Sequence, residues 1–212
     1  MNVTELIQII RNIVNEASTV NDAFSQETDQ AITAAIQSAA TMMASMPTYR
    51  GDAATLSDNA AVTFQQRPDG LMYATVRMPA DALRPVSIHI EGWALPVYQF
   101  LTVANPKFLA QYASVKGIGA GPASPVAFIA NDGGTHIIAH AVKKEGTCTV
   151  KYIPVPVIQD GELSMPDIYR EALAYNAAGL YMQSVNEYDA AKTAFDTAAA
   201  YIQNINHEKS EE

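Results

Sequence analysis

Apolar side chains near the start of the chain recur at the spacing of an amphipathic helix. They are Leu6, Ile9, Ile10, Ile13, Val14 and Ala17. The polar stretch 18–25 predicts the end of this helix, and Ser25 is a candidate cap for the next one. The second predicted helix ends before Pro47 and repeats the pattern with Ile32, Ala35, Ile36, Ala39, Met43 and Met46.

The middle of the chain changes to a period of two, which is typical of strands. Apolar residues alternate with polar ones over 72–78 and 86–90, and turn residues follow at 67–70, 91–92, 131–134 and 145–146. Further strands are predicted at 94–99, 125–130, 135–142 and 147–153, with a short helix at 106–114. The pattern favours an antiparallel sheet folded into a small barrel or sandwich.

Helical spacing returns in the last part of the chain. Ser164, Pro166 and Asp167 form a start signal, with the serine as the predicted cap. The following helix is apolar on more than one side, which predicts a central buried position. Asn186 is the predicted cap of a final helix, whose apolar stripe comprises Ala191, Ala194, Phe195, Ala198, Ile202 and Ile205.

These patterns predict an α+β fold in which helices at both ends of the chain share one bundle. Neither helical pair can bury both of its faces alone, so packing one pair against the other is the natural solution. We therefore expect residues 1–47 and 160–206 to form the bundle, 48–159 to form an inserted β-rich domain, and 207–212 to be a charged tail.

Charge and cysteine content narrow the function classes. The formal net charge of −9 argues against a protein that grips nucleic-acid phosphates, because that task needs a surplus of Lys and Arg. The same charge is compatible with a surface that DNA slides past. Cys148 is the single cysteine, so an intracellular origin is the simplest expectation. We also expect no export signal and no membrane span.

Candidate chemistry is sparse. His136 and His140 lie four residues apart in a predicted strand near Asp132, so one alternative is a metal-dependent enzyme. Polar residues on an exposed strand face explain the same pair, and no third ligand is apparent. Cys148 shares a strand face with Val150 and Tyr152, which predicts a buried inert thiol. We therefore predict no catalytic residue, metal or cofactor.

Several loose motifs resemble the head-to-tail adaptor or ring proteins of crAss-like and related short-tailed bacteriophages. One is the step Met78–Arg84 before a strand, and a second is the turn Gly92-Trp93-Ala94-Leu95-Pro96-Val97. A third is the glycine-rich stretch Gly119–Val126, and the helical pair Tyr169–Ile202 looks like the closing hairpin of that family.

The resemblance implies a structural, non-enzymatic virion protein. It implies a homo-oligomeric ring of twelve copies that joins the portal to the next tail ring or hub, assembled in the cytoplasm of the bacterial host. DNA would pass through this ring without sequence-specific binding. Candidate interface residues are Trp93, Tyr98, Tyr169, Tyr181 and Tyr201, although Trp93 also fits a core anchor of the β region. The alternative from another class is a cell-surface or carbohydrate-binding β module.

Overall fold

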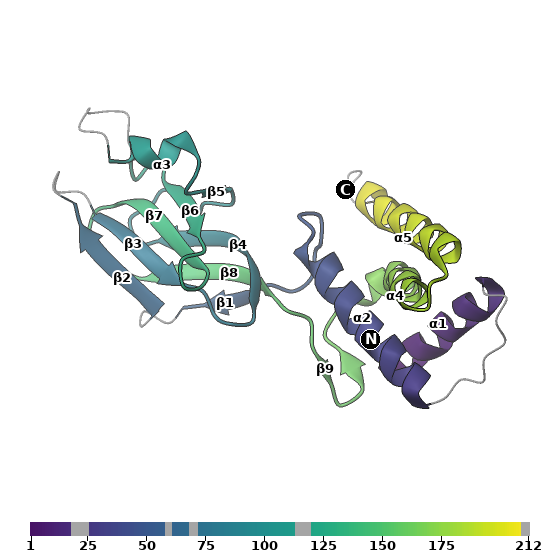
Figure 1. The fold of residues 1–212 in the computed structure, drawn as a ribbon. Coiled ribbons are helices and arrows are strands. Elements are labelled where there is room, and N and C mark those ends of the chain that lie inside the picture. Colours follow the sequence, from purple (N-terminus) through teal and green to yellow (C-terminus); the bar gives the residue numbers. More distant parts are fainter. Residues whose placement is uncertain (18–25, 58–60, 68–71, 113–119, 209–212) are drawn as a thin grey trace. The chain divides into compact units, whose positions relative to one another are not determined.

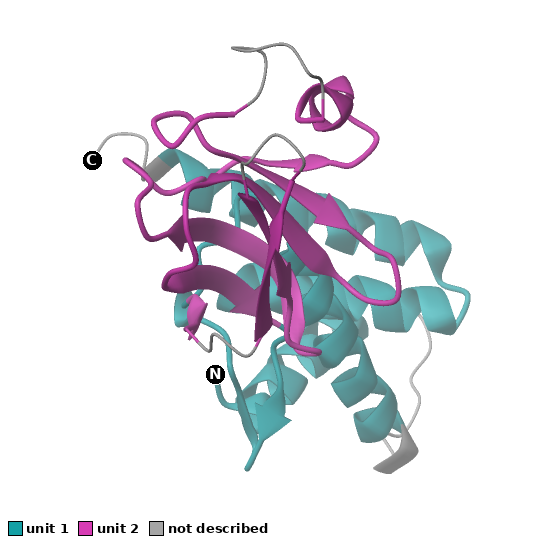
Figure 2. Cartoon of the chain, turned by 90° about the vertical axis from the view of Figure 1, so that its left-hand side faces the viewer, with its two compact units in different colours: residues 1–52, 155–212 teal, residues 53–154 magenta. Residues whose placement is uncertain are grey.

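A computed structural model describes residues 1–17, 26–57, 61–67, 72–112 and 120–208 of the chain. The chain divides into two compact units, which Figure 2 colours separately. Unit 1 comprises Met1–Asp52 and Val155–Glu212, and unit 2 comprises Ala53–Pro154. Among the described helices, none combines the length and apolarity needed to cross a lipid bilayer.

Unit 1 consists of long helices and one small hairpin (Figure 1). Its elements are α1 (Val3–Ala17), α2 (Gln26–Ser45), β9 (Ile158–Gln159), β10 (Glu162–Leu163), the short 3₁₀ helix η2 (Asp167–Tyr169), α4 (Arg170–Ser184) and α5 (Tyr188–Glu208). Helix α4 contacts α1, α2 and α5. It therefore buries more than one of its sides, as its apolar pattern predicted, with Ala172, Leu173, Ala174, Ala177, Ala178 and Met182 among the buried residues.

Most of the residues in the stripes predicted for the first two helices lie in the core of unit 1, whereas Ile9, Ile13 and Met46 are only partly buried. Leu6 and Ile10 of α1 are buried, and so are Ile32 and Ile36 of α2. The break that separates these helices, with the proposed cap Ser25, lies outside the described residues.

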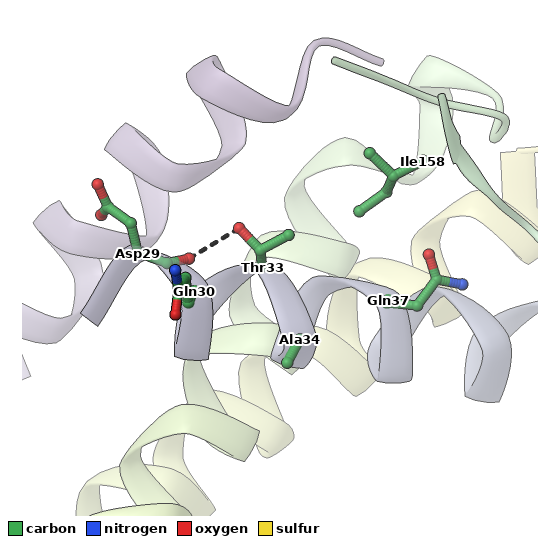
Figure 3. A pocket seen from close by; sticks show the side chains of 6 residues that line it. All are labelled: Asp29, Gln30, Thr33, Ala34, Gln37 and Ile158. Atoms are coloured by element: carbon green, nitrogen blue, oxygen red, sulfur yellow. Dashed lines mark hydrogen bonds between the residues drawn. The ribbon is translucent and has the colours of Figure 1, made fainter. Parts of the chain in front are cut away.

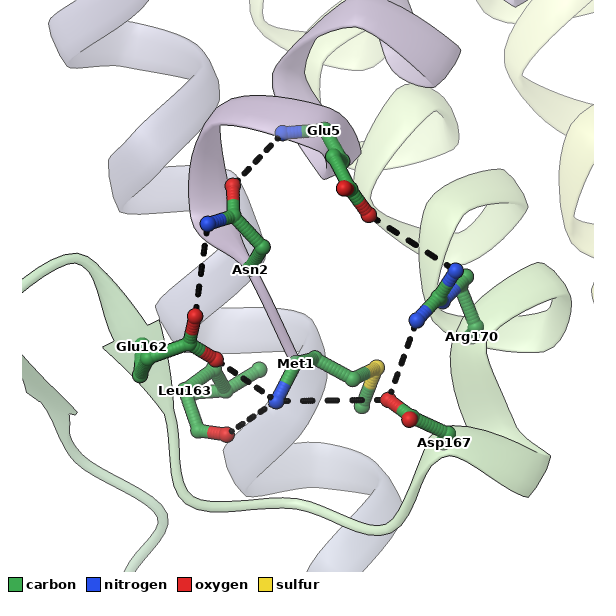
Figure 4. Close-up of polar contacts among 7 residues, drawn as sticks. All are labelled: Met1, Asn2, Glu5, Glu162, Leu163, Asp167 and Arg170. Carbon is green, nitrogen blue, oxygen red and sulfur yellow. Dashed lines mark hydrogen bonds and ion pairs between the residues drawn. The ribbon is translucent and has the colours of Figure 1, made fainter.

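The start of α1 is tied to the hairpin and to the start of α4 by polar contacts (Figure 4). Asn2 caps the helix by accepting a hydrogen bond from the Glu5 backbone N–H at 3.1 Å, and its amide donates to Glu162 at 3.3 Å. Arg170 pairs with Asp167 at 3.2 Å and with Glu5 at 3.7 Å. These contacts join residues from opposite ends of the sequence within one unit.

Two of the predicted helix caps are wrong. The Ser164 hydroxyl accepts a hydrogen bond from the Val157 backbone N–H at 2.8 Å, so it closes the β9–β10 hairpin instead of capping η2. Asn186 has a φ of 67° and ends α4, because its N–H donates to the Gln183 carbonyl while the Glu187 N–H donates to that of Met182. This pair of bonds is the Schellman motif of a helix C-terminus.

Unit 2 contains two stacked sheets and a short helix. Its elements are β1 (Ala54–Leu56), β2 (Val62–Gln66), β3 (Met72–Arg77), β4 (Ala82–Ile90), β5 (Phe100–Thr102), α3 (Pro106–Ala110), β6 (Val126–Ala130), β7 (His136–Val142) and β8 (Cys148–Pro154). The larger sheet has the order β2-β3-β7-β6-β5, and the smaller has the order β1-β8-β4. All neighbouring strands run antiparallel except β5 and β6, which are parallel.

The core of unit 2 lies between the two sheets. The larger sheet contributes Ala74, Val76, Ile137 and Ala139, and the smaller contributes Ile88, Ile90, Cys148 and Val150. Cys148 is buried as predicted, and burial raises the pKa of its thiol to about 11. Neither sheet closes on itself in the described residues, so the barrel alternative is wrong and the arrangement is sandwich-like.

Other departures from the predicted strands have local causes. The segment 94–99 is not a strand, because it forms turns that contact β4 only through a bridge between Val97 and Ile88, and the strand begins at Phe100. Strands β1 and β2 and the β9–β10 hairpin were missed, since two- to five-residue runs carry little periodic signal.

Candidate interaction surfaces

In the loop between β4 and β5, two large apolar side chains are exposed, and hydrogen bonds fix the residues next to them. Trp93 is buried and its indole N–H donates to the Ala141 carbonyl at 3.1 Å. Val97 exchanges two backbone hydrogen bonds with Ile88, of 2.8 and 2.9 Å. Between and beside these anchors, Leu95 is 68% exposed and Tyr98 is 70% exposed. Preordered apolar groups of this kind lower the entropic cost of docking to another protein.

Of the aromatic residues proposed for an interface, Trp93 and Tyr169 are buried within their units. The Tyr169 hydroxyl accepts a hydrogen bond from the Arg50 backbone N–H at 2.9 Å. Tyr201 is 37% exposed and stacks on Tyr175 with ring centroids 5.7 Å apart. Tyr181 is partly exposed. The surface therefore offers Tyr98 and Tyr201 most directly, and the interface role of all five residues stays a prediction.

The outer face of the larger sheet carries a buried histidine among aromatic rings. His140 is 0% exposed, and neither of its ring nitrogens has a hydrogen-bond partner among the described residues. Four aromatic rings surround it with centroid distances from 5.5 to 6.1 Å: Tyr73, Phe108, Tyr112 and Phe128. Burial, with a smaller contribution from the positive charge of Arg67, lowers the pKa of His140 to about 4.

Helix α3 covers one side of this aromatic cluster. Phe108 lies on α3, and the buried Gln111 just after the helix accepts a hydrogen bond from the Ala120 N–H at 2.7 Å. Arg67 lies 5.3 Å above the Tyr112 ring. This cluster could not be predicted from sequence patterns, because its members come from four separate segments whose contacts depend on the sheet order.

His136 and His140 are not placed for a shared metal ion. The strand rise separates residues four apart by about 13 Å, whereas a bound ion needs ligand atoms about 2 Å from it. The Nε2 atom of His136 lies 3.1 Å from the Asp132 carbonyl oxygen. The described part of the chain contains no group of three or more His, Cys, Asp or Glu side chains arranged to hold a metal.

Unit 1 contains a groove along α2 (Figure 3). Its volume is about 480 Å³, and its lining comprises Asp29, Gln30, Thr33, Ala34, Gln37 and Ile158. The carboxylate among them, Asp29, pairs with Arg11, and the Gln37 amide donates to the Pro156 carbonyl at 2.5 Å. Because the side chains with chemistry are already paired, this groove offers no arrangement for acid–base or nucleophilic catalysis.

Comparison with known proteins supplies the assignment that these surfaces alone do not. A search of curated proteins finds no match. A family model described as SU10 adaptor protein matches residues 1–211, which is almost the whole chain. The chain therefore belongs to the SU10 adaptor protein family, and it is a structural adaptor of a bacteriophage virion whose role implies contact with other head and tail proteins.

Proposed function

We propose that the protein is a subunit of an oligomeric ring that connects the portal to the tail of the virion and forms part of the DNA channel. The observation that carries this proposal is the family match over residues 1–211. The proposal includes the ring, its twelve copies, the portal as partner, and an origin in crAss-like or related short-tailed phages.

The charge of the chain supports passage of DNA without adhesion. The formal net charge is −9, with 22 acidic residues against 13 Lys and Arg. Like charges repel the phosphate backbone, and there is no surplus of cations to release its counterions. An adaptor that lines a channel needs this property, because each DNA contact retained by the wall would slow ejection.

The exposed apolar residues supply candidate contacts between copies. Closed rings form when one surface of a subunit binds a different surface of its neighbour and the rotation closes. Leu95 and Tyr98 present one such apolar surface in unit 2, and Tyr201 presents another in unit 1. We propose that Tyr98 and Tyr201 contact neighbouring subunits or the adjacent ring.

We further propose that the helices of residues 1–47 and 160–206 form one bundle domain, with the β-rich residues 48–159 as a second, inserted domain. The contacts of α4 with α1, α2 and α5 support the first part. The core that both sheets of unit 2 share supports the second.

The ring can be tested by electron microscopy and sedimentation of the purified protein. Both measurements are made on the protein alone and on its mixture with portal protein from the same phage. The expected result is a closed ring, at least when portal is present. A protein that stays monomeric at every concentration and never sediments with portal would overturn the proposal.

Matched variants locate the contact. We expect Tyr98→Ala to weaken ring formation at least tenfold in concentration. Tyr188→Ala is the matched control, because Tyr188 is also well exposed, at 61% against 70% for Tyr98, and is not assigned to an interface. This substitution should leave assembly unchanged. Equal effects of both substitutions would contradict the role of Tyr98.

A further inference from the structure

The outer edge of β2 is an open backbone edge that lacks the usual protection. No strand in the described part of the chain pairs with this side of β2, which is the outermost strand of its sheet in Figure 1. Alternate residues of an edge strand point their N–H and C=O groups outward, ready to pair with another chain. Soluble proteins commonly block such edges with charges, prolines, bulges or very short strands.

The other edges in unit 2 carry these devices, and β2 does not. Strands β1 and β5 have three residues each. Strand β4 contains Pro85, has two register shifts, and pairs at Ile88 with Val97. By contrast, β2 has the sequence Val-Thr-Phe-Gln-Gln and pairs with β3 over five residues without a register shift. It contains no charge and no proline, so it is the edge best suited to receive a strand.

A pocket beside β2 indicates which side chain the added strand carries. The pocket measures about 370 Å³, and its lining comprises Val62, Phe64, Glu91, Glu145, Gly146 and Thr147. Val62 and Phe64 provide an apolar wall on β2, and the two glutamates lie across from it on the turns of the smaller sheet. A side chain with an aliphatic stem and a positive tip matches this combination.

The two carboxylates remain available to a cation. The Thr147 N–H at 3.4 Å, and then Lys144 at 3.2 Å, lower the pKa of Glu91, so this group stays ionised at neutral pH. Lys144 is 71% exposed, and a surface pair of this kind contributes little and exchanges readily. Glu145 is exposed and has no ion-pair partner among the residues that the structure describes.

We propose that the β2 edge binds an extended segment of a partner protein, which adds a strand to the larger sheet and places a Lys or Arg side chain between Val62, Phe64 and the carboxylates of Glu91 and Glu145. The backbone ladder supplies affinity and the pocket fixes the register and the residue type. This inference does not rest on the proposed ring, because it concerns one surface of a single copy.

Synthetic peptides test the proposal on the full-length protein as purified. The probe is the blocked peptide Thr-Val-Thr-Lys-Thr-Val-Thr with a fluorescent label, and its partner peptide has Glu in place of Lys. Fluorescence anisotropy measures affinity, and hydrogen–deuterium exchange locates the site. We expect the Lys peptide to bind at least tenfold more tightly than the Glu peptide and to slow exchange at 62–66 and 145–147.

Two controls separate the ladder from the pocket. A Lys peptide N-methylated at alternate residues cannot donate to β2 and should lose binding, whereas Glu145→Gln should weaken binding of the unmodified Lys peptide about fivefold without affecting the fold.

The proposal is overturned if no peptide binds, if the Glu peptide binds equally, if N-methylation has no effect, or if protection falls elsewhere. A second copy as occupant would appear as protection of 62–66 that depends on protein concentration without any peptide. Absence of a ring leaves every one of these measurements unchanged.

Discussion

The rings of Tyr49 and Tyr169 lie with their centroids 4.9 Å apart at an interplanar angle of 32°, which joins the segment after α2 to the start of α4. Both side chains are buried in unit 1. The Tyr169 hydroxyl also accepts the hydrogen bond from the Arg50 N–H, so this residue links the two segments through both packing and polarity.

The substitution Tyr169→Phe keeps the ring and removes the acceptor. We expect the free energy of unfolding to fall by about 1 kcal/mol, because the Arg50 N–H loses its partner at a partly buried position. Tyr169→Ala removes the ring as well and should cost roughly 3–5 kcal/mol. Urea denaturation measures both. Tyr98→Phe, at an exposed site, is the control and should change stability by less than about 0.5 kcal/mol.

Gly179 allows α5 to approach α4 closely. A Cβ atom built at this position would lie 2.7 Å from the ring of Phe195. Gly179→Ala therefore sets overpacking of about 1–3 kcal/mol against a gain of about 1 kcal/mol in helix propensity. We expect net destabilisation, measured by thermal or urea unfolding.

The substitution Phe195→Leu introduces a smaller side chain and should relieve the clash with the Cβ atom of Ala at position 179. In a double-mutant cycle, the Leu substitution is expected to cost less in the Gly179→Ala background than in the wild type. Strict additivity of the two substitutions would show that the contact does not limit the approach of the helices.

Asn186 occupies a left-handed backbone position, with φ at 67°. Asn186→Ala should destabilise unit 1 by about 1 kcal/mol, since a Cβ-bearing residue without a local hydrogen-bonding side chain resists this conformation. Asn186→Gly should be neutral or slightly stabilising. Calorimetry of the pair checks the order. An alanine variant as stable as the glycine variant would argue against the Schellman ending of α4.

His140 makes the stability of unit 2 depend on pH. In the folded protein, burial lowers the pKa of His140 from its ordinary value of 6.5 to about 4, so the unfolded chain binds the proton more readily. The stabilisation is complete above about pH 6.5, declines as the pH falls through that value, and levels off below about pH 4. Its full size is roughly 3 kcal/mol.

His140→Leu should remove this dependence while filling a similar volume. The difference in unfolding free energy between the two proteins, measured by urea titration from pH 7.5 to 4, cancels the other titrating groups. Among the residues that the structure describes, the ionisable groups near His140 are Arg67, Tyr73 and Tyr112, and all are common to both proteins. A difference that does not vary with pH would mean that His140 gains a proton as easily in the fold as in the unfolded chain.

Helix positions could be predicted well because amphipathic helices repeat their signal many times. The predicted ends of the first two helices at Ala17 and before Pro47 agree closely with the structure. The cap predictions were wrong because Ser164 and Asn186 are each compatible with several local motifs. The surrounding residues determine which of these motifs forms. The short strands β1 and β2 were not predicted, because they contain too few residues to establish a period.

The candidate surfaces were only partly accessible to sequence reasoning. Trp93 could be predicted as a core anchor from its place after a turn, but its hydrogen bond to Ala141 depends on a bulged β7 with a positive φ at that alanine. The exposure of Tyr98 and the burial of Tyr169 could not be distinguished, because both are tyrosines beside proline-containing turns.

The amino-acid sequence by itself determined the element types, the acidic balance and the buried stripes of the long helices, because these are local or additive properties. Only the tertiary structure decided which strand is left at the sheet edge, which rings enclose His140, and how closely α5 approaches Gly179. Those features depend on contacts between residues distant in sequence, where packing and hydrogen bonding of the whole unit select one pairing among several that the local pattern permits.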